Sequence, residues 1–188
     1  TGIRNSPTLV NIAYQDLLFW DGGAFTLEAQ ALAPLENPVE MDMNLGALLD
    51  RIKADPTYEA EFEDVFGQNA DVMTLTQALG AFQRTIRSGG SPFDRYTSGQ
   101  EQAISQAARR GMDLFEGKAG CASCHSGFLF TDQSYQNNGL SFVAPDSGRA
   151  RITLDANDFA KFRVPTLRNV GSSFPFMHDG RFSSLDQV

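Results

Sequence analysis

The sequence predicts an all-α protein with long irregular loops, and two observations carry that prediction. Apolar residues recur at helix spacing in four segments of the chain, three of which close at a proline or a glycine. No segment shows the period-two alternation of apolar and polar residues that predicts a strand, and there is no internal repeat. The 188 residues, of which 41% are hydrophobic and 20% charged, are enough to bury the core of one large domain or two small ones.

The four helical segments follow one another along the middle of the chain. The first three cover residues 45–52, 58–66 and 72–86, and they close at Asp-Pro, Gly and Ser-Gly-Gly sequences respectively. The Gly-Gly-Ser-Pro sequence at 89–92 then predicts a break between two units. The fourth segment, 104–115, has apolar residues along one face and is expected to form an amphipathic helix.

Directly after this helix, Cys121, Cys124 and His125 form a C-x-x-C-H motif, the pattern of c-type haem attachment. Two thiols three positions apart on one helical turn can add to the two vinyl groups of a haem, and the following histidine then ligates the iron. A thioredoxin-like redox pair would require a βαβ pattern around the cysteines, and a structural zinc site usually needs four N or S ligands. The chain has two cysteines, and its other histidine, His178, lies far along the sequence, so we favour haem. The long loop predicted over residues 126–167, rich in Gly and Asn, is typical of a segment that encloses a cofactor.

The net charge of −8 argues against nucleic acid and against an anionic membrane surface as partners, and it suits docking to a basic redox protein. No apolar stretch approaches the roughly 20 residues that span a bilayer. With both cysteines committed to haem, no disulfide framework is expected. Covalent haem attachment takes place on the exported side of the bacterial membrane, so we expect a periplasmic location, although no signal peptide is present.

The two ends of the chain suggest an internal piece of a longer polypeptide. The sequence begins at Thr1 without an initiator Met, and it stops at Val188. That last residue falls in what is expected to be the first turn of a helix, with Ser183 or Ser184 as the N-cap.

Eight motifs, in one order along nearly the whole chain, resemble those of the bacterial dihaem cytochrome c peroxidases, a family that includes MauG. They are Arg-Asn-Ser-Pro-Thr-Leu (4–9), Phe-Trp-Asp-Gly (19–22), Leu-Glu-Ala-Gln (27–30), Pro-Val-Glu-Met (38–41), Phe-Asp-Arg (93–95), the C-x-x-C-H motif, Pro-Thr-Leu-Arg-Asn (165–169) and Met-His-Asp-Gly-Arg-Phe (177–182). In that family two cytochrome c-like helical domains each hold one haem. The resemblance therefore implies that residues 1–95 belong to the N-terminal peroxidatic haem domain, and residues 96–188 to a truncated C-terminal cytochrome c-like domain. It implies one covalent haem c in this chain and two in the parent protein, because the first haem motif of the family is absent here.

The resemblance also assigns catalytic roles. Trp20 would lie between the haems and relay electrons, whereas Gln30 and Glu40 would face the peroxide pocket of the first haem, with Pro34 at its rim. Cleavage of an O–O bond requires a proton moved from one oxygen to the other, and a carboxyl group in a dry pocket can move it. Burial would raise the pKa of such a glutamate. Without the resemblance, Trp20 would be read as a core aromatic residue and Glu40 as an ordinary surface carboxylate.

A calcium ion between the two haem domains is also implied, with Asn5, Ser173 and Pro175 as its protein ligands. Oxygen-only ligation of this kind is acceptable to a hard cation. The alternative is that Asn5 simply caps a turn. Four arginines could pair with the haem propionates through bidentate contacts, and the sequence does not choose among Arg149, Arg151, Arg163 and Arg168.

The sixth ligand of the second haem is a separate question. Met177 is one candidate, because His/Met ligation raises the potential of a haem. In the family this position is a packing residue, and the axial residue falls on a helix past Val188, so we favour the later position. We interpret His178 as a structural histidine, fixed by Asp179 or by a backbone group, rather than as an iron ligand.

Two functional classes follow. The first is a dihaem enzyme that reduces hydrogen peroxide with electrons from a small cytochrome c or cupredoxin, or that matures a protein-derived cofactor in a protein substrate as MauG does. The second is a monohaem c-type electron-transfer protein, which residues 96–188 alone would support. We favour the enzyme, because the residues predicted around Trp20 and Glu40 make sense only beside another haem. A Met at the axial position past Val188 would favour peroxide reduction, and a Tyr would favour maturation. A homodimer is compatible with the resemblance.

Overall fold

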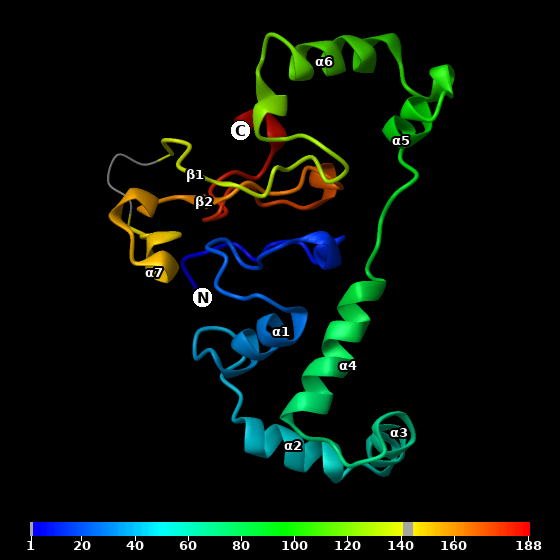
Figure 1. Ribbon diagram of the computed structural model, residues 1–188, viewed down its shortest axis with the longest axis vertical. Coiled ribbons are helices and arrows are strands. Elements are labelled where there is room, and N and C mark those ends of the chain that lie inside the picture. Colours follow the sequence, from blue (N-terminus) through cyan, green and yellow to red (C-terminus); the bar gives the residue numbers. More distant parts are fainter. Residues whose placement is uncertain (1, 141–144) are drawn as a thin grey trace. The chain divides into compact units, whose positions relative to one another are not determined.

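The computed structural model describes residues 2–140 and 145–188, and the protein is mostly helical, as predicted (Figure 1). It divides into two compact units, one formed by Thr1–Ile86 with Pro175–Val188 and the other by Arg87–Phe174. These compact units are not the predicted haem domains 1–95 and 96–188, whose assignment stays a prediction. The C-terminal segment joins the first unit because its backbone pairs with the N-terminal segment, where the Asn5 amide donates to the His178 carbonyl at 2.7 Å.

The α-helices described in the first unit are α1 (Leu27–Glu36), α2 (Leu45–Lys53), α3 (Pro56–Phe66) and α4 (Val72–Thr85). Helices α2, α3 and α4 confirm the predictions made from apolar spacing. Helix α1 was not predicted as a helix, and its first four residues were noted only as the Leu-Glu-Ala-Gln motif. Each helix begins after a side chain that accepts a hydrogen bond from a backbone amide of its first turn, which offsets the missing helical partners there. The capping residues are Thr26, Asn44, Asp55 and Asp71.

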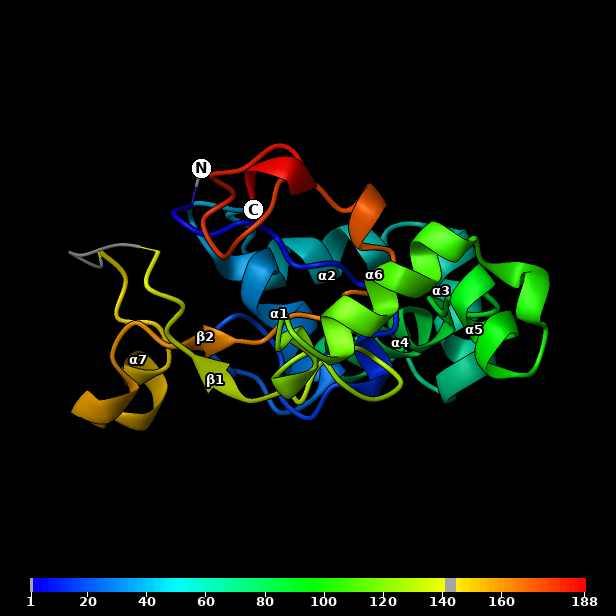
Figure 2. The same cartoon turned by 90° about the horizontal axis from the view of Figure 1, so that it is seen from above.

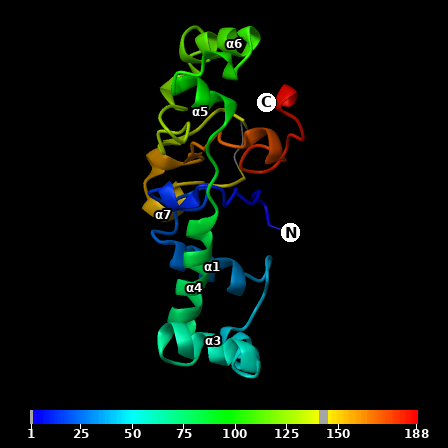
Figure 3. The same cartoon turned by 90° about the vertical axis from the view of Figure 1, so that its right-hand side faces the viewer.

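Helix α1 packs against α4, and Figure 3 shows the two lying side by side with α3 at the far end of α4. The Arg84 guanidinium of α4 donates to the Glu28 carboxylate of α1 at 2.7 Å. A small core lies at the start of α1 and comprises Ile12, Leu18, Ala24 and Leu27. A second core joins α2, α3 and α4 around Phe62, Ala70 and Leu75.

The second unit combines helices with two short strands. They are α5 (Pro92–Thr97), α6 (Gln106–Glu116), α7 (Ala150–Thr153), and the strands β1 (Tyr135–Gln136) and β2 (Phe162–Arg163). Helix α6 confirms the predicted amphipathic helix, and none of its residues is buried. The two short strands pair antiparallel, near α7 in Figure 2, and together with α7 they interrupt the predicted loop over 126–167. Residues 141–144 of that predicted loop lie outside the described residues.

Within the described part of the chain, no helix is both long enough and apolar enough to cross a membrane. The turn predicted at the C-terminal end is present as a short 3-10 helix, Leu185–Gln187, and the Ser184 amide donates to the Gln187 side chain at 3.3 Å.

Candidate functional site

The C-x-x-C-H motif forms one tight turn in the second unit. A short 3-10 helix covers Cys121–Ser123, and the His125 amide donates to the Cys121 carbonyl at 2.9 Å. Both cysteines are free thiols and partly exposed. The turn therefore presents two accessible thiols and an imidazole within five consecutive residues, as thioether attachment of a haem requires.

The ring of His125 is held by the loop that follows the motif. Its Nδ1 lies 3.0 Å from the carbonyl oxygen of Phe130. A carbonyl can only accept a hydrogen bond, so Nδ1 must carry the proton. The lone pair of Nε2 is then available to an iron ion, and metal-ligating histidines are held in this way by a second group. Among the described residues no three His, Cys, Asp or Glu side chains could hold one metal ion, so the motif's side chains do not converge as zinc ligands would.

Three consecutive carbonyl groups of that loop are each held by a different side chain. The Phe128 carbonyl accepts from Arg168 Nε at 2.7 Å, and the Leu129 carbonyl accepts from the Thr166 hydroxyl at 2.6 Å. The Phe130 carbonyl is the third, and it accepts from His125. Phe130 has a φ of 53°, a left-handed conformation that non-glycine residues adopt at a cost. The contacts at Leu129 and at Thr131, whose hydroxyl donates to the Val164 carbonyl at 2.6 Å, hold the backbone on both sides of this residue.

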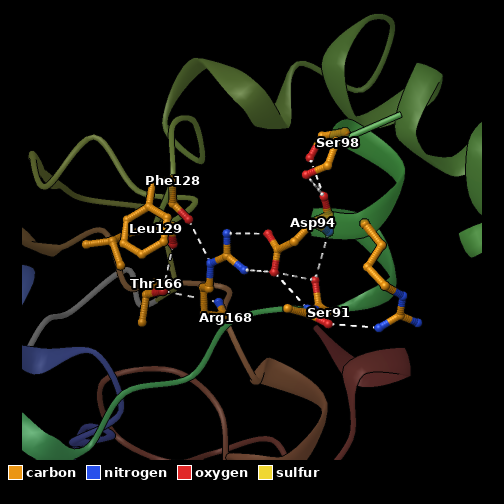
Figure 4. A network of polar contacts seen from close by, with 10 residues as sticks. Ser91, Asp94, Ser98, Phe128, Leu129, Thr166 and Arg168 are labelled. Atoms are coloured by element: carbon orange, nitrogen blue, oxygen red, sulfur yellow. Dashed lines mark hydrogen bonds and ion pairs between the residues drawn. The ribbon is translucent and has the colours of Figure 1, made fainter. Parts of the chain in front are cut away.

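Arg168 also forms a bidentate ion pair with Asp94 of α5 (Figure 4). Both N–O distances are 2.8 Å, and the Arg168 side chain is only 7% exposed. The hydrogen bonds from Arg168, with others from Ser91, hold the pKa of the Asp94 carboxyl well below its ordinary value. Sequence reasoning missed this pair. Asp94 was noted only within the Phe-Asp-Arg motif, and Arg168 was predicted as a partner of haem propionates, whereas its two terminal nitrogens pair with Asp94.

Of the other arginines predicted near haem propionates, Arg163 is buried, whereas Arg151 is exposed. Burial lowers the pKa of Arg163 from its ordinary value. The guanidinium of Arg149 lies over the Tyr135 ring, with its carbon 4.4 Å from the ring centroid. The pairing of these arginines with propionates stays a prediction.

Trp20 lies in the first unit, in a cluster built from both ends of that unit. The residue is 8% exposed, and its indole Nε1 donates to the Asn5 carbonyl at 2.7 Å. Its ring meets the His178 ring edge to face, with 6.4 Å between the centroids. Next to it in sequence, the Asp21 carboxylate is fully buried and pairs with Arg4. These contacts fix the orientation of the indole, and its role as an electron relay stays a prediction.

The residues predicted for the peroxide pocket lie on α1 and the turn that follows it. Gln30 and Pro34 are four positions apart in the helix and therefore share a face. Pro34 has no amide proton, so the Gln30 carbonyl loses its usual helical donor. The Met41 amide donates to the Pro34 carbonyl at 3.2 Å, which folds the turn carrying Glu40 back onto the end of the helix.

The side chains of this group differ in burial. The Oε1 atom of Gln30 is buried and has no hydrogen-bond partner among the described residues. Glu40 is exposed, and its carboxylate accepts a hydrogen bond from the side-chain amide of Asn37 at 2.8 Å. The burial expected of a pocket glutamate is therefore not present in this chain, and the catalytic roles of Gln30, Pro34 and Glu40 stay predictions.

Two of the predicted calcium ligands adjoin each other in the first unit. The Asn5 side-chain amide donates to the Pro175 carbonyl at 2.6 Å. Gly180 has a φ of 70°, and a Cβ at that position would lie 3.2 Å from Pro175 and 3.5 Å from Asn5, so the backbone packs closely here. Ser173 belongs to the second unit, where its hydroxyl donates to the Val170 carbonyl at 3.2 Å. Two oxygen-bearing groups side by side are compatible with a calcium ligand set.

Met177 and His178 lie in a loop closed by a bridge between Phe176 and Phe182. Met177 has a φ of 70°, and its carbonyl accepts from the Gly180 amide at 3.2 Å. His178 contacts Asn5 through its backbone and Trp20 through its ring. The arrangement favours the structural interpretation of both residues.

Comparison with known proteins places the chain in a family. The sequence profile described as di-haem cytochrome c peroxidase matches residues 1–102. The chain belongs to the di-haem cytochrome c peroxidase family. It is 42% identical over 190 residues to the methylamine utilization protein MauG of Methylorubrum extorquens, covering 98% of this chain and 53% of that protein. It is 35% identical over 192 residues to the cytochrome c551 peroxidase of Nitrosomonas europaea, covering 100% of this chain and 57% of the relative.

A solved structure of a MauG-like protein associated with microbial copper homeostasis superposes with a TM-score of 0.89 at 32% identity, covering 99% of this chain and 61% of that one. A second, of the diheme peroxidase BthA from Burkholderia thailandensis, gives a TM-score of 0.84 at 26% identity, with 99% of this chain and 56% of that chain covered. The predicted all-α cytochrome c-like fold is thereby confirmed. The chain spans about half the length of the curated relatives it matches.

Proposed function

We propose that this chain forms the larger part of a dihaem c-type peroxidase, which reduces hydrogen peroxide with electrons delivered through a haem c bound at Cys121, Cys124 and His125. The single observation that carries the proposal is the hydrogen bond from His125 Nδ1 to the Phe130 carbonyl. It prepares Nε2 as a ligand beside two free thiols. Membership of the peroxidase family supports the reaction type.

When bound, haem c supplies a one-electron redox centre whose potential depends on its axial ligands and their hydrogen bonds. The chain's own residues would hold it: Cys121 and Cys124 would attach it covalently through thioether bonds, and His125 would ligate its iron through Nε2. Trp20 is the proposed relay toward the peroxide site. Its indole can be oxidised, and the hydrogen bond to Asn5 keeps it in one orientation.

At the peroxide site, Gln30 binds and Glu40 moves a proton. The buried Gln30 Oε1 atom has no hydrogen-bond partner among the residues that the structure describes, and each end of hydrogen peroxide is an O–H donor. Glu40 sits on the turn tied to Pro34, and in this proposal it carries the proton from one peroxide oxygen to the other. We further propose that Asn5 and Pro175 contribute ligands to a calcium ion. The protein is expected in the periplasm, with a small cytochrome c or cupredoxin as its electron donor.

A second candidate is oxidative maturation of a protein-derived cofactor in a protein substrate. Two MauG proteins support it, since they are 42% and 39% identical to this chain. The axial residue beyond Val188 separates the two candidates, because Met supports peroxide reduction and Tyr supports maturation.

The experiment is turnover by the full-length protein, expressed with the c-type haem maturation machinery. Peroxide consumption is measured with a reduced small cytochrome c or cupredoxin as the donor. We expect consumption that requires both the donor and His125, with His125→Ala as the inactive comparison. A protein that binds haem and exchanges electrons with the donor, but consumes no peroxide, would instead support the monohaem-type electron carrier.

A further inference from the structure

Two motifs of the second unit have no role in the proposed reaction, yet the fold brings them together. Asp94 of the Phe-Asp-Arg motif and Arg168 of the Pro-Thr-Leu-Arg-Asn motif are 74 positions apart in sequence and form a bidentate ion pair (Figure 4). The pair lies against the loop that carries the Phe130 carbonyl. We propose that the Asp94–Arg168 pair is a positioning device, which holds the loop so that His125 donates a strong hydrogen bond to Phe130 and thereby sets the reduction potential of the haem bound there.

The guanidinium can take only one orientation in this arrangement. Its two terminal nitrogens face the Asp94 carboxylate, so Nε is aimed at the Phe128 carbonyl, 2.7 Å away. The planar fork of Arg couples these contacts, whereas a lysine would supply only a point charge. Asp94 is itself fixed, since its Oδ2 accepts from the Ser91 amide at 2.8 Å and from the Ser91 hydroxyl at 2.9 Å.

The same guanidinium packs on the aromatic rings of the loop. Its carbon lies 4.9 Å from the centroid of the Phe128 ring and 5.5 Å from that of the Phe130 ring. Phe93, next to Asp94, packs edge to face on Phe130 with 5.0 Å between the centroids. Phe130 is therefore contacted from Arg168 and from α5 while it holds a left-handed backbone conformation.

The loop contacts lead directly to the proximal histidine. Phe130 offers its carbonyl to His125 only while its backbone keeps that conformation, and residues in such conformations persist when their surroundings over-determine them. Replacing the guanidinium of Arg168 removes the hydrogen bond to the Phe128 carbonyl, two residues before Phe130. The backbone of Phe130 can then relax. The hydrogen bond from Nδ1 then weakens, the imidazole donates less charge to the iron, and the oxidised state is stabilised less. The reduction potential should rise.

The proposal rests on haem attachment at the C-x-x-C-H motif, so the test first measures covalent haem in the full-length protein. The informative variant is Arg168→Lys, which keeps the positive charge but loses the fork and the contact with Phe128. The matched control is Arg84→Lys, the same change at the Glu28 ion pair in the first unit. The readout is the reduction potential of the C-terminal haem, measured by spectroelectrochemical titration.

We expect Arg168→Lys to bind haem and to shift the reduction equilibrium toward the ferrous state by about threefold, or about 28 mV at 59 mV per tenfold for one electron. Arg84→Lys should match the parent. An unshifted potential in haem-loaded Arg168→Lys overturns the proposal. If that variant attaches no haem, Asp94→Glu, which keeps both charges but displaces the carboxylate, is titrated instead, and an unshifted potential there overturns it equally. If neither variant attaches haem while Arg84→Lys does, the pair serves folding alone and the proposal is wrong. Absence of haem from the parent contradicts the proposed function instead.

Discussion

Replacing Asp94 by Asn should destabilise the protein through the charge it leaves behind. The substitution keeps the shape of the side chain but removes the negative charge that faces a guanidinium only 7% exposed. Removing one partner of a buried ion pair costs about 3–5 kcal/mol. The Asp94 side chain is 24% exposed, so water screens part of the interaction, and we expect a loss of about 2–3 kcal/mol. If the region spanned by this chain unfolds as one cooperative unit, such a loss lowers its melting temperature by about 4–12 °C.

The assay is thermal unfolding of the full-length protein, with Asp158→Asn as the control. The Asp158 side chain is 25% exposed, close to the 24% of Asp94, but it pairs with Lys161 through a single contact of 3.2 Å. The control should therefore lose much less stability. Equal losses of stability in the two variants would contradict the prediction, because they would show that the bidentate contact and the burial of Arg168 do not determine how much stability is lost.

The same pair gives a pH dependence of defined sign. Arg168 and Ser91 stabilise the charged form of Asp94, so its pKa in the folded state lies below its ordinary value. The stabilisation is fully present above the ordinary Asp pKa of about 3.9 and is lost as the pH falls toward the folded-state pKa. The difference in stability between the parent and Asp94→Asn should therefore be constant near neutral pH and shrink below about pH 4. A difference that grows on acidification would contradict this assignment.

Three further outcomes are expected at other sites in the chain. Trp20→Phe should leave both haems bound in the full-length protein but slow the peroxide-driven oxidation of the second haem, followed by stopped-flow absorbance; an unchanged rate would remove the relay. Glu40→Gln should lower peroxide turnover by at least about 10²-fold with haem content unchanged, because the amide cannot shuttle a proton, and Glu36→Gln should be nearly silent. Gly148→Ala should cost at least about 2 kcal/mol in urea unfolding, because Gly148 has a φ of 57° and a Cβ there would lie 2.3 Å from the Lys161 carbonyl; a neutral substitution would contradict the backbone geometry.

The sequence predicts the longer helices well because their signals are local. The stop at Gly67, for example, needs only the left-handed conformation that a glycine adopts at a helix end, and its φ is 68°. The C-x-x-C-H turn is likewise contained in five residues. The short strands β1 and β2 gave no such signal, since two residues are too few for an alternating pattern.

The contacts that hold the site join residues far apart in the sequence, so the local spacing of residue types could not predict them. Asp94 and Arg168 are 74 positions apart, and Asn5 and Pro175 are 170 positions apart. The local signal at Asp94 is the Ser-x-x-Asp capping box that starts α5, and it predicts the start of a helix but not a partner 74 positions away. The return of the C-terminal segment to the first unit depends on backbone pairing with Asn5, a contact 173 positions apart that no local pattern predicts.

Covalent attachment of haem at the C-x-x-C-H turn is tested most directly by mass spectrometry of one peptide. Cleavage after Lys118 and Arg149 releases residues 119–149, which contain both cysteines and His125. From full-length protein matured with the c-type haem machinery, this peptide should carry the mass of one haem and no thiol that an alkylating reagent can modify. Recovery of the peptide with two alkylated cysteines and no haem would contradict the assignment of the site.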